Sequence, residues 1–522
     1  MPVETTAPTG ATSLWGEPTE PACLAARIPA VAANHPDRVA VIDGDRVLTY
    51  RELLAWAART AEVLRAHGLR RGDLVAIACP RGADAVAALL AVTLSGCAYV
   101  PLDLEYPRLR LEHMLRDSAA RLVLHVGETF ELDTTATAVR IPEPTGDHAA
   151  EPVPPWINTC DPGLPVYVIY TSGSTGWPKG VVLQHSCLDS VAHWQSVFSP
   201  EPDLRTAQFA PLNFDVSFQE IFGGLYGGAT LVIMPERLRR DPTALLAWLA
   251  EHRVERLFLP YVALKMIAVA ASFGAPLDEL ALVEVNVAGE QLVCSDDIRA
   301  LFTALPRCRL VNHYGQSESA MVTAHVLEGP PDRWPTLPPI GAPLPGCELL
   351  VDVEDGEDAG ELLVAGRPVA LGYLNRPELN ARRYTAIAPT GHGHTKVFRT
   401  GDLVRLRDGR VHFLTRIDDD VKLRGIRINL AEVDAQLIAL PGIASAVTVV
   451  VEGAGGTRVL RAAVVLVDGV ALDEEHTIRR LREALPEVST PVSITALPSM
   501  PTTPSGKLDR EAVTASLKDA FA

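Results

Sequence analysis

Apolar residues recur with two different periods along the first part of the chain. Over residues 48–68 (LTYRELLAWAARTAEVLRAHG) they follow one face of a helix, Thr49 and Glu52 have the spacing of a capping box, and Gly68 is placed to end the helix. Apolar runs at 74–79, 98–102 and 121–126 predict buried strands, and residues 83–94 predict a further helix. Strands that alternate with helices indicate an α/β fold with a mostly parallel sheet.

The pattern changes close to Arg416. The stretch IDDDVKLRGIRI that follows is densely charged, and after it we expect a helix near 430–440, strands at 444–451 and 460–467, and a helix at 474–485. A chain of 522 residues is too long for one compact core. We therefore predict a large N-terminal domain of layered sheets and helices over residues 1–416 and a small α+β domain over residues 417–522.

Composition and charge argue against several classes of protein. The formal net charge is −17 and no basic tail is present, so we expect no nucleic-acid partner. The N-terminal segment lacks the pattern of a signal peptide, and Ser95, Gly96 and Pro101 interrupt the charge-free run 85–102, which favours a buried helix and strand over a membrane span. The 8 cysteines form no CxxC pair and several lie in apolar runs, which is typical of free thiols in a reducing compartment. We therefore expect a cytoplasmic protein with no membrane partner.

Residues 170–180, YTSGSTGWPKG, have the composition of an anion-binding loop between two apolar runs. Gly173 and Gly176 let backbone N–H groups approach an anion, and Lys179 supplies a positive charge. Hydroxyl donors come from Thr171, Ser172, Ser174 and Thr175. The loop is not a Walker motif, because Pro178 precedes the lysine and Gly180 follows it, and this spacing excludes a P-loop kinase.

This loop resembles the signature of the adenylate-forming superfamily, which includes acyl-CoA synthetases, luciferases and the adenylation domains of nonribosomal peptide synthetases. The resemblance covers nearly the whole chain, in the order LTYREL (48–53), GCAYVPLDLEYP (96–107), YTSGSTGWPKG (170–180), NFDVSFQEIF (213–222), NHYGQSE (312–318), GELLVAGRPVALGYLN (360–375), FRTGDLVR (398–405), TRIDDDVKLRGIRINLAEVD (415–434) and PTTPSGKLDR (501–510). AYVPLD and FDVSFQE favour the amino-acid-activating branch. The resemblance implies that a carboxylate attacks the α-phosphate of ATP and that a thiol then attacks the acyl-adenylate, with ATP and Mg²⁺ as cofactors.

The resemblance also implies roles for single residues. Lys507 would be the catalytic lysine that bridges the substrate carboxylate and the α-phosphate. Asp402 would bind the ribose hydroxyls, Arg416 would make a second nucleotide contact, and Glu318 would bind magnesium. Further ATP-binding positions are Asn312 and Tyr314, which hold and stack on adenine, and Gly315 and Ser317. The small domain would rotate about Asp418 between the two half-reactions, and Gly425 would line the tunnel for the thiol-bearing arm.

Several positions depart from the common pattern of the family. They are Gln316 for proline, Ser317 for threonine, Thr415 for glycine, Asp420 for glutamine, Asn429 for glutamate and Ala431 for glycine. The change at Ser317 keeps a hydroxyl group, whereas the changes from Thr415 onward affect the rotated arrangement of the small domain.

Asp215 matches the aspartate that pairs with the substrate ammonium in amino-acid-activating relatives, and a buried carboxylate there rejects acids that lack the amine. The substrate positions carried over are Asp215, Val216, Gln219, Val262, Asn286, Ala288, Gly289, His313, Met321, Val322 and Lys507. Apart from Gly289, this set resembles the pocket of proline-activating domains, with Val262, Asn286 and Met321 as departures. An unpaired buried amide is costly, so we expect a substituted or ring-modified proline, or a small amino acid whose polar group meets Asn286.

The end of the sequence suggests how the product is used. Only 12 residues follow PSGKLDR, so we expect a freestanding enzyme that loads the phosphopantetheine thiol of a separate carrier protein. The resemblance also allows a small accessory (MbtH-like) protein. The alternatives are a CoA ligase of the same superfamily, an enzyme that passes the adenylate to an amine, and a non-catalytic nucleotide-binding homologue.

Overall fold

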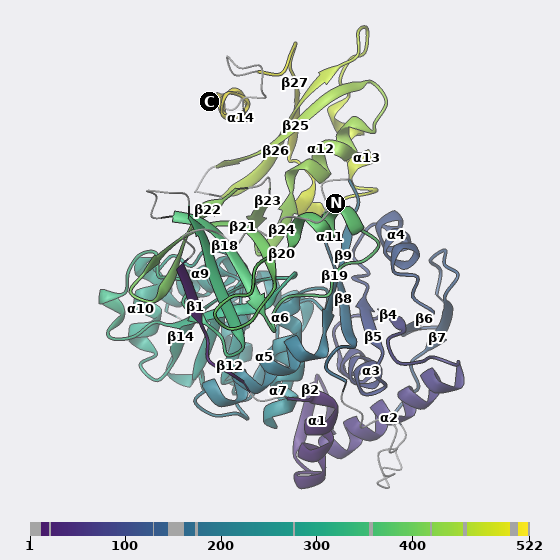
Figure 1. Cartoon of the computed structure of the whole chain (residues 1–522), viewed down its shortest axis with the longest axis vertical. Helices are drawn as coiled ribbons and strands as arrows, with labels where there is room; N and C mark the ends of the chain where they lie inside the picture. Colours follow the sequence, from purple (N-terminus) through teal and green to yellow (C-terminus); the bar gives the residue numbers. More distant parts are fainter. Residues whose placement is uncertain are drawn as a thin grey trace.

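The computed structural model has two parts that follow each other along the sequence (Figure 1). We call the described residues up to 417 the N-terminal body and those from 420 onward the C-terminal lobe. The described residues are 12–19, 22–128, 130–144, 161–172, 176–274, 277–353, 359–417, 420–452, 457–501 and 510–519.

A seven-stranded sheet in the N-terminal body carries the candidate phosphate loop. In spatial order its strands are β19 (Gly372–Tyr373), β9 (Lys179–Gln184), β8 (Pro165–Thr171), β5 (Ala98–Pro101), β4 (Leu74–Ala78), β6 (Leu122–His125) and β7 (Thr137–Arg140). The strands from β8 to β7 pair in parallel, whereas β9 and β19 pair antiparallel at one edge. Thr171 at the end of β8 lies opposite Lys179 at the start of β9, so the loop joins two neighbouring strands.

A nine-stranded sheet holds most of the predicted substrate positions. Its strands, in spatial order, are β16 (Ala342–Pro343), β15 (Ala320–Val326), β14 (Arg309–Gln316), β13 (Glu284–Val287), β12 (Arg256–Leu259), β10 (Thr206–Gln208), β11 (Leu231–Ile233), β2 (Val39–Asp43) and β3 (Arg46–Thr49). The strands from β14 to β2 are parallel, and β14 pairs antiparallel with β15 with an irregularity at Tyr314 and Gly315.

A six-stranded antiparallel sheet completes the N-terminal body. Its strands are β1 (Thr12–Trp15), β17 (Cys347–Val353), β18 (Ala359–Gly366), β21 (Lys396–Arg407), β20 (Tyr384–Ala386) and β22 (Arg410–Arg416). The β21–β22 register places Asp402 directly opposite Arg416, so two of the predicted nucleotide contacts are neighbours across one hairpin.

Helices of the N-terminal body cover and separate these sheets. They are α1 (Leu24–Asn34), α2 (Tyr50–Ala66), α3 (Ala83–Leu94), α4 (Arg108–Ser118), α5 (His185–Phe198), α6 (Asp215–Phe218), the π-helical η2 (Gln219–Gly223), α7 (Gly224–Gly227), α8 (Pro242–Glu251), α9 (Tyr261–Ser272), α10 (Asp296–Ala304) and α11 (Pro377–Arg383), with 3₁₀ turns η3 (Glu236–Arg240), η4 (Leu277–Glu279) and η5 (Pro331–Arg333). Helix α3 is buried on nearly every side and contacts β4, β5 and β2, as expected for a helix that is apolar all round.

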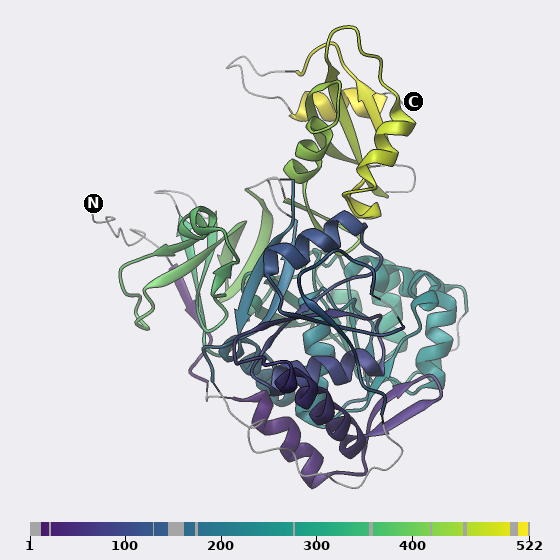
Figure 2. The same ribbon diagram turned by 90° about the vertical axis from the view of Figure 1, so that its right-hand side faces the viewer.

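The C-terminal lobe projects from one end of the N-terminal body (Figure 2). It contains a hairpin of β23 (Asp420–Leu423) and β24 (Ile426–Asn429) and a sheet of β25 (Ile443–Glu452), β26 (Arg458–Leu466) and β27 (Ser493–Ala496). Its helical elements are α12 (Leu430–Ile438), α13 (Glu474–Leu481), η7 (Glu487–Ser489) and α14 (Arg510–Asp519). Val433, Leu437 and Leu460 belong to an apolar cluster made within the lobe itself.

The elements predicted from periodicity are confirmed. Helix α2 has the full capping box of Thr49 and Glu52, and Gly68 after its end has a φ of +72° in the left-handed region. Helix α3 has the predicted bounds, and the strands at 74–79, 98–102 and 121–126 are β4, β5 and β6. In the C-terminal lobe, α12, β25, β26 and α13 lie at the predicted positions, although α13 already ends at Leu481.

The cysteines follow the expectation with one exception. The free cysteines, all buried, are Cys79, Cys97, Cys187, Cys294, Cys308 and Cys347. Cys23 is disulfide-bonded, so the expectation of a free thiol is wrong for this residue. It lies just before α1 and is only partly buried, whereas the free thiols are buried. None of the described helices combines the length and apolar character needed to cross a membrane.

Candidate functional site

The described ends of the phosphate loop point into the region between body and lobe. Thr171 is buried, and its hydroxyl has no hydrogen-bond partner among the described residues, which leaves it available to a ligand. The Ser172 hydroxyl donates to the carbonyl of Arg427 (3.2 Å) and accepts from the N–H of Asn429 (3.0 Å). Lys179 extends over the ring of Tyr373 at 4.4 Å. Gly173, Ser174 and Thr175, predicted to bind ATP, lie outside the described residues.

Glu318, the predicted magnesium ligand, has no exposed surface. Its carboxylate accepts hydrogen bonds from the Tyr373 hydroxyl (2.8 Å) and from Arg427 of the C-terminal lobe (2.7 Å), and Lys179 lies 3.7 Å away. Burial alone would raise the pKa of Glu318, but Arg427 and then Lys179 outweigh burial and lower it to about 2. The residue therefore supplies a full negative charge at neutral pH.

Asp402, the predicted ribose ligand, is anchored on both carboxylate oxygens. Arg416 donates to Oδ1 at 2.6 Å, and the Tyr314 hydroxyl donates to Oδ2 at 2.5 Å. Gln316 also donates to Oδ2 and to the carbonyl of Thr400. The sequence marks Gln316 only as a departure from the family's proline and does not predict its role as a support for Asp402, because a motif shows that a residue differs and not what it contacts.

The other predicted adenine-side residues lie along and just after β14. The Asn312 side chain donates to the carbonyl of Pro339 (2.9 Å), which fixes its amide. Gly315 has no room for a side chain, because a Cβ there would lie 1.9 Å from the Ala320 carbonyl oxygen. Ser317 lies in the turn between β14 and β15 and is partly buried.

Two of the departures from the family pattern compensate each other. Asp420 and Asn429 are opposite each other in the β23–β24 hairpin, and the Asn429 amide donates to Asp420 at 2.6 Å. The family pattern has glutamine at position 420 and glutamate at position 429. The pair thus keeps one amide and one carboxylate, but the two groups have exchanged positions. Asp420 also accepts from Arg427 (2.5 Å) and Arg416 (3.4 Å), and these arginines outweigh burial and lower its pKa. Arg427 therefore joins Asp420 of the lobe to Glu318 of the body, a contact that the densely charged stretch could have suggested.

The residues present fit ATP and magnesium. The orphaned hydroxyl of Thr171 and the buried carboxylate of Glu318 offer a donor and an acceptor of the kinds that phosphate oxygens and magnesium need. Magnesium in such sites is commonly bound through one or two carboxylates together with phosphate oxygens. Among the described residues, no group of three or more His, Cys, Asp and Glu side chains is placed to hold one ion.

Asp215 lies at the start of α6 and is partly buried. The N–H of Val216 donates to its carboxylate at 2.9 Å. Burial raises the pKa of Asp215, and the Val216 N–H and the ammonium of Lys422 act against this rise. Lys422 of β23 also interacts electrostatically with Asp402, so the predicted ammonium-binding and ribose-binding carboxylates lie around one lysine of the lobe. A cationic amine and a nucleotide could therefore be held close together.

His313 lies on β14 between aromatic rings. Trp194 of α5 and Phe258 of β12 approach it edge-on, with centroid distances of 5.6 and 6.3 Å. The side chain is buried, both ring nitrogens lack hydrogen-bond partners in the described part of the chain, and burial lowers the pKa of the imidazole to about 4. A neutral ring with an unused donor and acceptor is therefore available at this position.

Asn286 is the departure from the proline-type pocket that the structure explains most directly. Its amide nitrogen donates to Glu284 at 3.0 Å, in a buried network that also contains Arg256, Arg309 and Ser199. The amide thus has a protein partner. The amide therefore does not need a polar group on the substrate.

The remaining substrate positions do not form a single cluster. Met321 and Ala288 pack with Trp194. The backbone carbonyl of the buried Gln219 accepts from the side-chain amide of Gln195 (3.2 Å). Val322 follows Met321 on β15, but its side chain belongs to the main core of the body. The side chains of these two neighbours therefore lie in different clusters. Val262 lies on α9, where its N–H donates to Glu290 (3.2 Å), and Gly289 has a φ of +86°.

Gly425 lies at the tip of the β23–β24 hairpin, against the N-terminal body. Its N–H donates to Glu290 at 2.8 Å, and a Cβ on it would lie 2.7 Å from Cβ of Pro260. Its φ of +80° lies in the left-handed region, so both the backbone and the lack of space require glycine here. Lys507 and Asp418, the predicted catalytic and hinge residues, lie outside the described residues.

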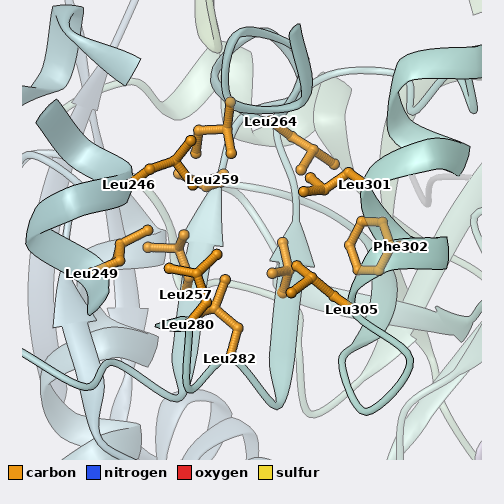
Figure 3. A pocket seen from close by; sticks show the side chains of 12 residues that line it. Leu246, Leu249, Leu257, Leu259, Leu264, Leu280, Leu282, Leu301, Phe302 and Leu305 are labelled. Atoms are coloured by element: carbon orange, nitrogen blue, oxygen red, sulfur yellow. The ribbon is translucent and has the colours of Figure 1, made fainter. Parts of the chain in front are cut away.

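An apolar cavity of about 10 Å³ lies inside the N-terminal body, between α8, α9, α10 and β12 (Figure 3). Leucines such as Leu246, Leu257 and Leu301 line it, together with Phe302. A space of this size without polar partners holds neither a nucleotide nor a stable water. We therefore interpret it as a packing gap in the core.

Two family models match the chain. The model described as AMP-binding enzyme matches residues 28–374, and the one described as AMP-binding enzyme C-terminal domain matches residues 432–507. Among curated proteins, the chain is 38% identical over 509 residues to phosphinothricin tripeptide synthetase PhsB of Streptomyces viridochromogenes, covering 94% of this chain and 42% of that protein. It is 35% identical over 493 residues to tyrocidine synthase 2 of Brevibacillus parabrevis, covering 92% and 13%. The chain thus spans less than half the length of these relatives.

Solved structures agree with this result. One is a holo nonribosomal peptide synthetase protein that contains adenylation and PCP domains and is bound to a vinylsulfonamide inhibitor, with a TM-score of 0.80, 25% identity and coverage of 94% of this chain and 84% of that chain. Another is an artificially fused adenylation–PCP di-domain from Klebsiella oxytoca, with a TM-score of 0.77, 25% identity and coverage of 91% and 94%.

Proposed function

Because the chain belongs to the AMP-binding enzyme family, and is an ATP-dependent, AMP-forming ligase of the nonribosomal-peptide-synthetase adenylation type, we propose that it activates an amino acid for transfer to a carrier protein. The substrate carboxylate is converted to an aminoacyl-adenylate with release of pyrophosphate. The aminoacyl group then passes to the phosphopantetheine thiol of the carrier protein.

One observation carries this proposal: Asp215, Glu318 and Asp402 are linked by electrostatic interactions, either directly or through Lys422. Lys422 interacts with both Asp215 and Asp402, and Asp215 interacts with Glu318. A carboxylate for a substrate ammonium therefore lies next to carboxylates suited to magnesium and ribose. A fatty or aryl acid would leave the charge of Asp215 unpaired, which supports an amino acid as the substrate.

In the first half-reaction the chain positions charges. Asp402, held by Tyr314 and Arg416, accepts hydrogen bonds from the ribose hydroxyls. Thr171 and Lys179 would bind the phosphates, and Glu318 would hold magnesium, which would neutralise phosphate charge. A carboxylate oxygen of the amino acid attacks the α-phosphorus, a P–O bond forms, and the bond to pyrophosphate breaks. Lys507 is proposed to stabilise the charge that develops at this phosphorus.

In the second half-reaction the thiol sulfur attacks the acyl carbon, the C–O bond to AMP breaks, and the thiol proton passes to solvent. We propose a domain boundary at residues 416–417 and rotation about Asp418, so that the β23–β24 hairpin faces the acceptor. The contact of Gly425 with Pro260 and Glu290 supports a position of this hairpin tip against the N-terminal body in this half-reaction.

For the substrate we propose proline or a related small or cyclic amino acid. Trp194 and Phe258 flank a neutral His313, Met321 packs with Trp194, and Glu284 already accepts from the Asn286 amide. A side chain without a polar group is therefore compatible with the pocket. A substituted ring that hydrogen-bonds to His313 is the second possibility that the pocket supports.

The test is amino-acid-dependent exchange of labelled pyrophosphate into ATP. The panel contains proline, hydroxy- and methylprolines, pipecolate and small acyclic amino acids, with and without an added MbtH-like protein. Exchange with a cyclic imino acid that disappears in Lys507→Ala supports both the reaction and the substrate class, whereas exchange only with an acyclic amino acid refutes the substrate class. Offering free CoA and a carrier protein as acceptors then separates the proposed function from a CoA ligase.

A further inference from the structure

A buried ion pair joins body and lobe outside the candidate site. Arg110 of α4 donates to Glu432 of α12 at 2.7 Å, and the two residues are 4% and 2% exposed. Helix α4 lies at the end of the body from which the lobe projects (Figure 1). None of the roles assigned to the site residues uses either side chain. Because the pair spans the two parts of the molecule, its burial depends on how they are arranged.

Both partners are held in position by their own part of the molecule. The guanidinium of Arg110 lies over the ring of Tyr106 at 5.1 Å, and the Tyr106 hydroxyl accepts from Asn213 at 2.6 Å. In the lobe, the Asn429 side chain caps α12 by accepting from the N–H of Glu432 at 3.2 Å. The two charges are therefore presented to each other by ordered elements and not by flexible chain ends.

The arrangement that buries this pair competes with bound magnesium triphosphate. Arg427 of the lobe donates to Glu318, and the Ser172 hydroxyl donates to the Arg427 carbonyl and accepts from the Asn429 N–H. Glu318 and the Ser172 hydroxyl are the groups proposed to bind the metal and the phosphates in the first half-reaction, and the Gln436 side chain, which donates to the Gly176 carbonyl, holds the lobe against the same loop. The arrangement therefore belongs to the step after pyrophosphate has left.

We propose that Arg110 and Glu432 are positioning residues for thioester formation, which hold the lobe in the arrangement that follows pyrophosphate release. This inference rests on the proposed function. Removing one member leaves a buried charge without its partner only while the lobe is docked, since in another arrangement water can solvate it. The substitution therefore shifts the population of lobe arrangements and leaves the fold of each part intact.

The test separates the half-reactions in Glu432→Gln and Arg110→Met. Pyrophosphate exchange should stay within about twofold of wild type, whereas single-turnover transfer from the preformed adenylate to a carrier protein should fall at least about tenfold, as expected when a docked state loses a buried ionic contact. Arg116→Met on the exposed side of α4 is the matched control and should transfer at the wild-type rate.

The double variant Arg110→Met/Glu432→Leu provides a rescue. An apolar pair leaves no buried charge, so its transfer rate should exceed that of either single variant. Unchanged transfer in both single variants overturns the inference, as does a parallel loss of exchange and transfer. Absence of exchange in the wild-type protein would instead refute the proposed function, so the two failures are distinguishable.

Discussion

Glu318 and Glu220 are both completely buried, yet the pKa values of their carboxyl groups shift in opposite directions. Around Glu318, Arg427 and Lys179 outweigh burial and lower the pKa to about 2. Around Glu220, burial dominates and raises the pKa to about 8, although the N–H groups of Phe209 and Ala210 donate to the carboxyl at 3.2 and 3.0 Å. Burial alone thus does not decide whether a carboxyl group is charged.

The difference lies in what surrounds each group. Besides the Tyr373 hydroxyl, the partners of Glu318 are the ends of two long cationic side chains, one of them on the other part of the molecule, and these charges can be exchanged for a metal ion. The partners of Glu220 are the N–H groups of Phe209 and Ala210 and the side-chain amide of Gln208, all in the segment that leads to Asp215, so they cannot leave without unfolding it. Glu318 is a charged group whose cationic partners can be replaced, whereas Glu220 fixes the conformation of the segment that leads to Asp215.

The largest effect is expected for Glu318→Ala. Without this carboxylate the nucleotide side loses its proposed magnesium ligand, and pyrophosphate exchange should fall at least about 100-fold, as for other groups that stabilise charge in a transition state. Steady-state exchange at saturating amino acid measures this. Glu348→Gln is the matched control, because Glu348 is also completely buried, on β17, where it accepts from Thr390 at 2.6 Å. Equal losses in both variants would contradict the special role of Glu318.

Glu220→Leu should act on the fold before it acts on the chemistry. It leaves the N–H groups of Phe209 and Ala210 without acceptors, which should lower the free energy of unfolding by about 1–3 kcal/mol. Urea denaturation measures this change. Because the affected segment leads to Asp215, KM for the amino acid should rise more than KM for ATP. A larger rise for ATP would show that Glu220 supports the nucleotide side instead.

The two glutamates should also give stability opposite dependences on pH. The pKa of Glu220 rises on folding from 4.5 to about 8, so the folded state holds its proton longer and stability falls as pH rises through this interval. The pKa of Glu318 falls from 4.5 to about 2, so its contribution is present above pH 4.5 and is lost as pH falls below it. Each slope is at most about 1.4 kcal/mol per pH unit.

Denaturation at several pH values in Glu220→Gln and Glu318→Gln checks these slopes. The first variant should flatten the profile above pH 4.5, and the second should flatten it below. Profiles that change on the same side of pH 4.5 would show that the two groups do not differ in charge as the structure indicates.

The smallest effect is expected for Gln316→Ala. The variant removes a neutral side chain that donates to Asp402 while Tyr314 and Arg416 remain. KM for ATP should rise about threefold, in keeping with the net value of one hydrogen bond. Initial rates at varied ATP measure it. A loss as large as that of Glu318→Ala would mean that Gln316 takes part in nucleotide binding directly.

The sequence predicted regular elements well where the periodicity was strong. The bounds of α3 and the capping box of α2 follow from local spacing and local hydrogen bonds, which a sequence displays directly. Motif resemblance indicated Glu318, Asp402 and Asp215, and the structure places these carboxylates within one electrostatic neighbourhood.

Contacts between distant segments could not be predicted in this way. The pairing of Arg427 with Glu318 joins residues 109 positions apart and depends on how the lobe docks. The partner of the Asn286 amide is Glu284, two residues away on the same strand, yet its orientation depends on the buried arginines around it. Spacing gives no information about either, because both result from packing among segments that the chain brings together only after folding.

Strand β14 alternates its side chains between the two proposed ligand sites. Tyr314 and Gln316 reach Asp402 on the proposed nucleotide side, whereas His313 lies between Trp194 and Phe258 on the proposed amino-acid side. One face of a single strand can therefore accumulate substitutions while the other keeps its contacts. Such a division allows the choice of amino acid to diverge in evolution, or to be redesigned, without rebuilding the energy-supplying half of the enzyme.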